Sequence, residues 1–342
     1  MAKRVLGIDV DSAVIKAAEV TRKGRSVAVS ALGVMQLPPG TIKDGRVANE
    51  NSLAKALQDL LEKYEFKATS AVLGLRSSWV TVKKHTFPSM PERELDKALE
   101  FEVPELAGFS VLSLEDVFYD YFISSKTDSE VEVVLVACPR QNALPYLQAV
   151  RSAGLTLEAI DVPAFGWKDL LAEDGRRVFM EISEEQTTMF VASSGVFKVH
   201  RVVPLGASHF RRGVEDAFDC SPEEAVQLCQ SQDLDYLLLE GSGNKRVLRA
   251  AVQQFIGSVL QTLDFIRAQE RASSFSAMLD ELIVLGDLAD IRGLSEMLHR
   301  EVGLPVRALR TMERLSLTFE VLPPGRFSCY GSALALGLRG VS

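Results

Sequence analysis

Short apolar runs separated by polar turns fill the first 40 residues of the chain. VLGIDVD is a mostly apolar run, VIKAAEV alternates between apolar and polar positions, and SVAVSALGVMQL follows a Lys-Gly-Arg turn. This pattern predicts three strands. A helix is expected from residue 51 or 52 to about residue 64, because Asn51 or Ser52 is a suitable N-cap and leucines then recur on one helical face. Another buried strand is expected at 70–77.

The pattern between residues 80 and 160 predicts a second group of strands and helices. WVTVKKHTF, VFYDYFI, EVEVVLVACP and LTLEAIDVP have the apolar content of strands. A helix is expected at 92–107, where apolar residues fit a helical period, although Pro104 should kink or end it. A further helix is expected at 142–153, before the terminating Gly154.

The remaining residues begin near Arg177 with three strands in succession. Helices are expected at 208–219, 222–231 and 246–270, and the last of these has a long apolar stripe at helical spacing. DELIVLGD predicts a strand and IRGLSEMLHREVG a helix. FSCYGSALALGLRG closes the chain as a short apolar helix, which we expect to pack back on the first part of the molecule.

The two halves of the chain resemble one another. RVLGID near the N-terminus and RVFME at 177–181 each place a carboxylate at the end of a buried strand, and each is followed by two more strands. A repeat separated by half the chain suggests two related lobes with a cleft between them. The alternative is that any two buried β units look alike.

Composition narrows the class of protein. The 342 residues include 38 Lys+Arg and 46 Asp+Glu, for a formal net charge of −8, and this length suggests roughly two domains. The acidic balance argues against a nucleic-acid binder, which would need clustered positive charge. The four cysteines are scattered and only four histidines occur, so a structural zinc site is not expected and the thiols suit a reducing compartment. No apolar run reaches the ~18 residues of a membrane span.

One segment has the composition of a phosphate cradle. GIDVDSAVIK places an Asp, a Ser and a Lys around a turn of small residues, where backbone N–H groups can approach phosphate oxygens and a carboxylate can hold a magnesium water. An ordinary solvated turn is the alternative. Turns in the second half could complete such a site. The candidate cofactor-binding residues are Asp9, Ser12, Lys16, Glu181, Ser183, Gly206 and Gly286.

Six segments, in order along nearly the whole chain, resemble the PilM family of type IV pilus assembly, which is related to the cell-division protein FtsA. They are GIDVDSAVIKAAEV, ELDKALEFEVPELAGFSVLSLEDVFYDYFI, AIDVPAFGWKDLL, FIGSVLQTLDFIRAQE, IVLGDLADIRGLSEMLHREVGLPV and YGSALALGLRG. The resemblance implies an α/β, actin-like fold of two lobes and four subdomains with duplicated ribonuclease-H-like cores.

The resemblance also divides the chain. The first-lobe core is expected at 1–80, 157–176 and 327–342, with an inserted subdomain at 81–156. The second-lobe core is expected at 177–207 and 276–326, with a helical subdomain at 208–275.

By this resemblance the protein is a cytoplasmic adaptor of a type IV pilus or related type II secretion machine, peripheral at the inner membrane. The implied partner is the N-terminal cytoplasmic peptide of a PilN-like inner-membrane protein, which docks in a groove of the first lobe. Phe101, Leu106 and Phe109 are candidates to border that groove, with ordinary core packing as the alternative. Pilus motor ATPases are further candidate partners, and self-association is common among actin-like relatives.

The resemblance raises ATP with Mg²⁺ as a cofactor, but three loops depart from the family pattern. Family nucleotide binders usually have Gly where Asp11 and Asp287 stand, and Asp-x-Gly where Glu181, Ile182 and Ser183 stand. A carboxylate ~4 Å from a phosphate charge costs on the order of 4 kcal/mol at an effective dielectric constant near 20. We therefore expect a degenerate site without catalytic residues. The alternative is an ATP-binding switch with weak or no hydrolysis, which the retained Asp9, Ser12 and Lys16 keep open.

Overall fold

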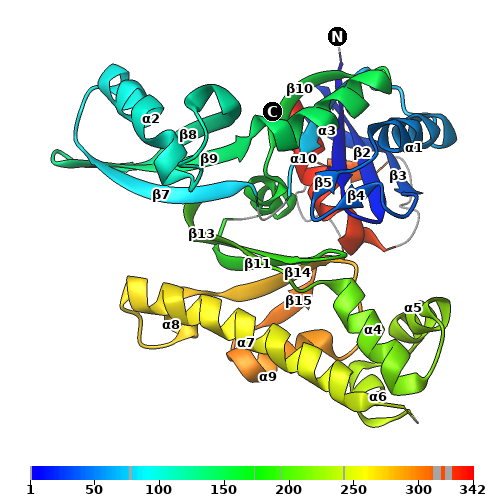
Figure 1. Cartoon of the computed structure of the whole chain (residues 1–342). Helices are drawn as coiled ribbons and strands as arrows, with labels where there is room; N and C mark the ends of the chain where they lie inside the picture. The colour runs from blue at the N-terminus through cyan, green and yellow to red at the C-terminus, as the bar shows by residue number, and fades with distance from the viewer. Residues whose placement is uncertain are drawn as a thin grey trace.

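The computed structural model describes residues 2–76, 79–172, 174–193, 195–241, 243–310, 317–319 and 326–342. Two lobes lie one above the other, and a smaller unit projects from the side of the upper lobe (Figure 1). We call these the first lobe, the second lobe and the inserted subdomain.

The first lobe contains a sheet in the order β10-β6-β1-β2-β3-β16. Strands β1, β2 and β3 form an antiparallel meander, and β6 and β10 run parallel to β1. The strands are β1 (Lys3–Val10), β2 (Val14–Lys23), β3 (Ser26–Gln36), β6 (Ser70–Gly74), β10 (Thr156–Asp161) and β16 (Leu317–Phe319), with a hairpin of β4 (Ile42–Lys43) and β5 (Arg46–Val47). The helices are α1 (Glu50–Lys63), α3 (Arg140–Ser152) and α10 (Gly331–Val341), with the 3₁₀ segments η2 (Pro163–Leu170) and η3 (Phe327–Tyr330).

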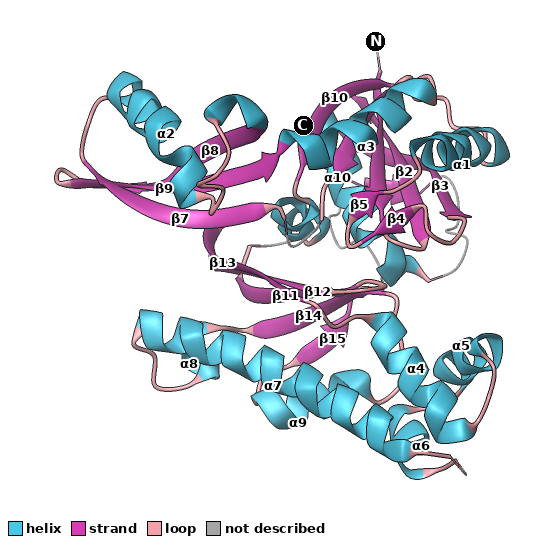
Figure 2. Ribbon diagram, viewed as in Figure 1, coloured by secondary structure: helices cyan, strands magenta, loops and turns pink. Residues whose placement is uncertain are grey.

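The second lobe repeats this plan. Its sheet has the order β13-β12-β11-β14-β15, again an antiparallel meander followed by parallel strands. Its helices lie on the side of the sheet away from the first lobe (Figure 2). The strands are β11 (Arg176–Ile182), β12 (Thr187–Ser193), β13 (Val196–Val203), β14 (Glu281–Gly286) and β15 (Val306–Ala308). The helices are α4 (Ala207–Phe218), α5 (Pro222–Ser231), α6 (Leu234–Leu239), α7 (Lys245–Glu270), α8 (Phe275–Met278) and α9 (Leu294–Val302).

The shared strand order confirms the predicted two-lobed fold. Strand β1 of the first lobe and β11 of the second occupy equivalent positions, each between the next strand of its meander and a parallel neighbour. The carboxylates at their ends, Asp9 and Glu181, are therefore equivalent as well.

The inserted subdomain has its own small core. Its sheet has the order β7-β9-β8 and carries one longer helix. The elements are β7 (Thr81–Pro88), α2 (Glu92–Leu106), η1 (Leu114–Asp116), β8 (Val117–Lys126) and β9 (Glu130–Pro139). Buried Leu95, Leu99 and Val103 of α2 pack on apolar residues of this sheet.

Two segments pack across the predicted subdomain boundaries. Helix α3 falls within the predicted inserted subdomain 81–156, yet its buried Ala143, Tyr146 and Val150 belong to the core of the first lobe. Because α2 already covers the sheet of the inserted subdomain, the apolar face of α3 packs with α1 instead. Strand β16, which falls within 276–326, pairs with β3 of the first lobe.

Local details also differ from the expectation. Helix α1 is capped by Asn49, whose Oδ1 accepts a hydrogen bond from the Ser52 backbone N–H at 3.0 Å, rather than by Asn51 or Ser52. Helix α2 continues past Pro104 and ends at Leu106, because a proline near the C-terminal end costs the helix little. The short helices α6 and α8 were not predicted, since they contain only six and four residues.

An aromatic cluster joins the three units. The ring of Phe165 in η2 lies 5.6 Å from Phe122 of the inserted subdomain, 5.6 Å from Phe190 and 5.8 Å from Phe197 of the second lobe, measured between centroids. Buried Trp167, two residues further along η2, contacts Phe190 as well. The segment that returns the chain to the first lobe therefore also fixes its contacts with the other units.

Helix α10 packs on the first lobe, as predicted. Its contact with β1 is made at a glycine. A Cβ atom on Gly7 would lie 2.0 Å from the Ala333 carbonyl oxygen and 2.4 Å from the Gly337 nitrogen. We expect Gly7→Ala to separate α10 from β1 and to lower the free energy of unfolding by about 1–3 kcal/mol or more. Urea denaturation followed by circular dichroism measures this loss.

The matched control is Gly257→Ala in α7, where a Cβ atom meets nothing within 4 Å. This substitution should stabilise the protein by up to about 1 kcal/mol through helix propensity. If Gly7→Ala leaves the free energy of unfolding unchanged, as a surface substitution would, α10 does not pack closely on β1.

Candidate functional site

The strand ends of both lobes meet between the two sheets. Asp9 of β1 pairs in register with Gly74 of the parallel strand β6 and with Lys16 of β2. In the second lobe, Ile182 of β11 pairs with Gly286 of the parallel strand β14. Because parallel neighbours end at the same edge of a sheet, the segments that follow these strands converge on one place.

Arg76, which follows β6, lies between the two equivalent carboxylates. Its guanidinium forms an ion pair with Asp9, and its Nη1 lies 3.0 Å from Glu181 Oε2. All three side chains are buried, with exposures of 6%, 1% and 3%. We call the Asp9–Arg76–Glu181 arrangement the cation bridge.

The second-lobe end of the cation bridge is held by uncharged donors. Ser332 Oγ of α10 donates to Glu181 Oε1 at 2.7 Å, and Trp167 Nε1 donates to Ser332 Oγ at 3.0 Å. Both donors belong to the first lobe. The Glu181 carboxylate is therefore fixed by first-lobe groups on more than one side.

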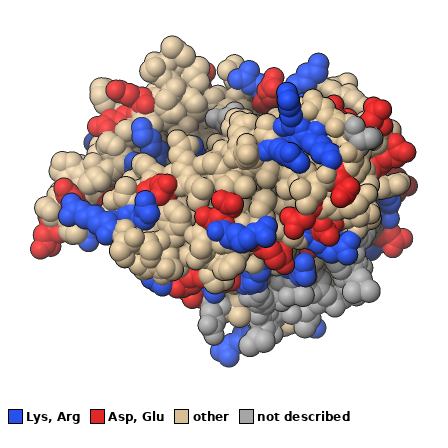
Figure 3. All heavy atoms as spheres, turned by 90° about the horizontal axis from the view of Figure 1, so that it is seen from below, with Lys and Arg blue, Asp and Glu red and all other residues tan. Residues whose placement is uncertain are grey.

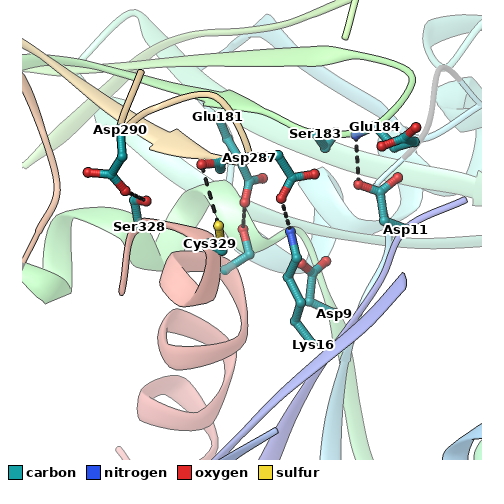
Figure 4. Close-up of polar contacts among 12 residues, drawn as sticks. Asp9, Asp11, Lys16, Glu181, Ser183, Glu184, Asp287, Asp290, Ser328 and Cys329 are labelled. Carbon is teal, nitrogen blue, oxygen red and sulfur yellow. Dashed lines mark hydrogen bonds and ion pairs between the residues drawn. The ribbon is translucent and has the colours of Figure 1, made fainter. Parts of the chain in front are cut away.

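Two further polar contacts cross between the lobes (Figure 4). Lys16 Nζ donates to Asp287 Oδ1 at 2.7 Å, and Lys16 is only 4% exposed. The Glu184 backbone N–H donates to Asp11 Oδ2 at 2.9 Å. Arg211 forms an ion pair with the Glu184 side chain and holds this turn from the second-lobe side.

The remaining candidate residues form the walls of the same place. Ser183 is buried in the β11–β12 turn, and its hydroxyl donates to the Gln186 carbonyl at 3.0 Å. A Cβ atom on Gly206 would lie 2.5 Å from the Ser183 carbonyl oxygen, and one on Gly286 would lie 2.2 Å from the Ile182 carbonyl oxygen. Both glycines thus permit close backbone packing beneath the turn. The structure brings all seven candidate residues around one region between the lobes.

Burial and charge shift the pKa values in this region. Burial raises the pKa of Asp9 to about 7, against the lowering effect of Arg76, and the nearby Glu181 raises it further. Burial disfavours the charged forms of Lys16 and Arg76, but their carboxylate partners outweigh it, so both pKa values are raised. Burial opposes ionisation of Asp287, yet Lys16 keeps the pKa of this carboxyl below its usual value.

A magnesium nucleotide does not fit this arrangement. The two buried cations that a phosphate would contact, Lys16 and Arg76, are already paired with carboxylates. Asp11 presents a negative charge at the turn and takes up the Glu184 N–H. Among the described residues, no group of three or more His, Cys, Asp or Glu side chains is placed to hold a metal ion.

The resemblance to the PilM family implies that adenosine would bind beside residues 283–306, and little space is left there. The cavity between the end of β11 and the second-lobe helices has a volume of about 30 Å³, and Phe210, Leu234 and Phe255 are among its lining residues. Ligand pockets commonly measure about 300–1,000 Å³. A nucleoside would have to displace several of these apolar side chains.

Some polar capacity is left in the region. Ser12 Oγ and Gln186 Nε2 are buried and have no hydrogen-bond partner among the described residues. Each can bind water or a single acceptor atom. Two uncharged donors do not balance the charge of a triphosphate.

A separate groove runs between the first lobe and the inserted subdomain. It has a volume of about 270 Å³ and is bordered by β8 and β9 on one side and by the ends of β6 and β10 on the other. Its lining residues are Leu75, Val80, Phe118, Tyr119, Asp120, Val136, Ala137, Cys138, Ile160, Asp161 and Val162.

The three residues predicted to border the peptide groove lie outside this groove, and their role in docking stays a prediction. Phe101 is 88% exposed on α2, while Leu106 and Phe109 are half-buried against the core of the inserted subdomain. None of the three lines the groove. The helical pattern around Pro104 indicated an apolar patch, but could not indicate which sheet edge it would face.

Sequence reasoning missed Arg76, Trp167 and Ser332. A signal for Arg76 was present: it directly follows the apolar run SAVLGL, and a strand parallel to β1 must end beside Asp9. No comparable signal marks Ser332, which lies among small residues of a closing apolar helix.

Comparison with known proteins agrees with the geometry. The family model described as type IV pilus assembly protein PilM matches residues 7–339. Among solved structures, the chain is similar to the PilM-PilN type IV pilus biogenesis complex, with a TM-score of 0.81 and 22% sequence identity over 99% of this chain and 98% of that chain.

Two more distant structures share the fold. Ethanolamine utilization protein EutJ from Carboxydothermus hydrogenoformans matches with a TM-score of 0.56 and 14% identity, over 99% of this chain and 89% of that chain. MreB 5 of Spiroplasma citri bound to AMPPNP matches with a TM-score of 0.52 and 11% identity, over 99% and 94%. The expected actin-like architecture is thereby confirmed.

The buried Asp9 carboxyl should give stability a distinct pH dependence. Its pKa is about 7 in the folded protein, against an ordinary value of 3.8, so the folded chain binds this proton more tightly than the unfolded chain. The resulting stabilisation is complete below about pH 4 and is lost as the pH rises through about 7. The Asp9→Asn variant lacks this titration. We therefore expect its free energy of unfolding, measured in urea, to rise relative to that of the wild type between about pH 4.5 and pH 7.5.

Asp280→Asn is the control for this experiment. Hydrogen bonds from Arg176 lower the pKa of Asp280 below 3.8, so its contribution is already complete above that pH. The difference between Asp280→Asn and the wild type should stay constant across the same range. A constant difference for Asp9→Asn as well would contradict the raised pKa.

Proposed function

This chain belongs to the PilM family of type IV pilus assembly proteins, and we propose that it is a non-catalytic adaptor that docks an extended peptide in the groove between the first lobe and the inserted subdomain. The observation that carries this proposal is the position of the groove between two sheet edges. Strand β8 is the edge of one sheet and β10 is the edge of the other among the described strands.

Sheet edges favour an extended occupant. An edge strand presents backbone N–H and C=O groups that an added strand can pair with, and pockets beside it select alternate side chains. The groove offers apolar surface from the half-buried Phe118, Val136 and Ile160. A peptide laid between β8 and β10 would bury apolar side chains there while its backbone pairs with one edge.

The charges of the groove favour a basic peptide. Asp120 is exposed on β8, and Asp161 on β10 is paired with Arg339 of α10. The Asp120 carboxylate, which also accepts its neighbour's Tyr121 N–H at 2.8 Å, remains accessible to an incoming cation. Apolar residues next to a free amino terminus, Lys or Arg would satisfy both features.

We identify the occupant as the N-terminal cytoplasmic segment of a PilN-like inner-membrane protein. The similarity to a PilM-PilN complex supports this choice. In the part of the chain that the structure describes, no helix combines the length and apolar character needed to cross a bilayer. The proposal therefore places the protein on the cytoplasmic side of the inner membrane through its partner.

The face of the molecule seen from below shows no large area of a single charge among the described residues (Figure 3). Seen from below, the coloured Lys, Arg, Asp and Glu side chains are interspersed with one another and with neutral residues (Figure 3). A surface of mixed sign does not favour one charged partner. The groove remains the feature with the clearest chemical preference.

The cleft is proposed to have lost nucleotide binding. Its cations are neutralised internally and its adenosine side is filled. The second candidate function is an ATP-binding switch of the same machine, which the unpartnered donors Ser12 Oγ and Gln186 Nε2 favour.

The docking proposal is tested with a fluorescent peptide that carries the N-terminal cytoplasmic segment of the PilN-like protein encoded beside this gene. We expect fluorescence anisotropy to show binding at tens of micromolar or tighter, on the order of 6 kcal/mol. Phe118→Ala and Asp120→Lys should each weaken binding about tenfold or more, because one removes groove surface and the other reverses its charge.

Phe101→Ala is the matched control, since this aromatic side chain is exposed on the same subdomain but lies outside the groove. It should leave affinity unchanged. Loss of binding with Phe101→Ala, but not with Phe118→Ala, would move the docking surface to α2.

The nucleotide proposal is tested by calorimetry with Mg·ATP. The wild type should show no binding tighter than about 1 mM. The Asp11→Gly/Asp287→Gly variant frees Lys16 and removes two carboxylates from the turns, so any affinity should be higher in the variant than in the wild type. Micromolar affinity of the wild-type protein would instead favour the ATP-binding switch.

A further inference from the structure

We propose that Arg76 is a built-in cation that holds the lobes together, taking the place between two carboxylates that a divalent metal ion would otherwise occupy. The proposal rests on the contacts of the cleft alone. It stands whether or not the groove binds a peptide.

The cleft places two buried carboxylates, one from each lobe, beside one cation. Asp9 comes from the first lobe and Glu181 from the second, and both are almost completely buried. Two buried carboxylates approach one another only with a cation between them or a proton on one of them, because desolvation and repulsion act together. Arg76 supplies that cation through separate contacts to each.

The carboxylate oxygens of the cation bridge converge on Arg76 from two sides. Glu181 presents both oxygens to Arg76, at 3.0 Å from Nη1 and 3.2 Å from Nη2. Asp9 Oδ1 is buried and accepts no hydrogen bond from the described residues. Carboxylate oxygens that converge from two sides are the donors that Mg²⁺, Mn²⁺ and Ca²⁺ prefer. The guanidinium fills this position and prevents a metal ion from entering.

The cation bridge differs from the other contacts between the lobes in the number of carboxylates that it joins. The Lys16–Asp287 pair joins one cation to one carboxylate. Removal of Lys16 leaves a single unpaired carboxylate, whereas removal of Arg76 leaves two that face each other. Only the second arrangement has the two anionic ligands that a divalent ion needs.

These contacts predict a specific rescue. In metal-free buffer, Arg76→Ala should lower the thermal midpoint by roughly 5–10 °C, as expected when one partner of a buried ion pair is removed from a protein of this size. Millimolar MgCl₂, MnCl₂ or CaCl₂ should restore much of this loss and leave the wild type unchanged. Hydrogen exchange should show faster exchange at residues 9–16 and 181–187 in the metal-free variant and slower exchange once the metal is added.

Lys16→Met is the matched control. It also breaks a buried pair between the lobes and should lower the thermal midpoint, but none of the three chlorides should restore it. Equal rescue of both variants, or equal stabilisation of the wild type, would show non-specific ion effects and overturn the proposal.

A second variant keeps the proposal testable if Arg76→Ala fails to fold. The Asp9→Asn/Arg76→Met/Glu181→Gln variant removes the charges together, and should fold without metal and show no response to it. The inference is overturned if this triple variant fails to fold. It is also overturned if Arg76→Ala in metal-free buffer has the same thermal midpoint as the wild type. Neither result depends on peptide binding in the groove.

Discussion

A single guanidinium separates two carboxylates that the duplicated fold places face to face. Because β1 and β11 are equivalent strands of two similar sheets, bringing the lobes together necessarily brings Asp9 toward Glu181. Something positive has to lie between them. Here the chain supplies it from the end of β6, and Ser332 and Trp167 fix the far carboxylate so that the arrangement has little freedom. Burial is the main cause of the raised pKa of the Asp9 carboxyl, and the nearby Glu181 carboxylate raises this pKa further while Arg76 lowers it.

Internal neutralisation of the cleft separates this chain chemically from proteins that hold a nucleotide between similar lobes. A lysine binds phosphate through an ammonium charge that is not already paired with a carboxylate. The ammonium of Lys16 is already paired with Asp287. The family pattern alone indicated that acidic residues replaced glycines. The structure adds that each acid has an intramolecular partner, so the substitutions form contacts between the lobes in addition to opposing phosphate. These contacts support the proposal that the outer groove, rather than the cleft, is the binding surface.

The resemblance to the PilM family implied the actin-like two-lobed fold, and the sequence pattern predicted the separate elements because period-two runs and long apolar stripes reflect burial directly. Strand β1, helix α7 and the duplicated meander could all be recognised in this way. It failed where burial depends on a distant surface. The apolar face of α3 looked the same whether it packed on the inserted sheet or on α1, and the apolar pattern around Phe101 gave no sign that this side chain is exposed on α2. Arg76 was missed for a similar reason, since a charged residue after a strand is usually solvated and only the approach of the second lobe buries it.

The cleft and the groove share a short stretch of backbone. Leu75 lines the groove and its neighbour Arg76 forms the cation bridge, so one residue faces each site at the end of β6. The Leu75 backbone N–H donates to the Asp161 carbonyl at 2.9 Å, which ties the same point to β10, the other wall of the groove. A rigid bridge in the cleft therefore also fixes the position of one groove wall. A preformed groove loses less conformational entropy when a flexible peptide binds, so closing the lobes with a side chain rather than with an exchangeable ligand accords with the proposed peptide docking.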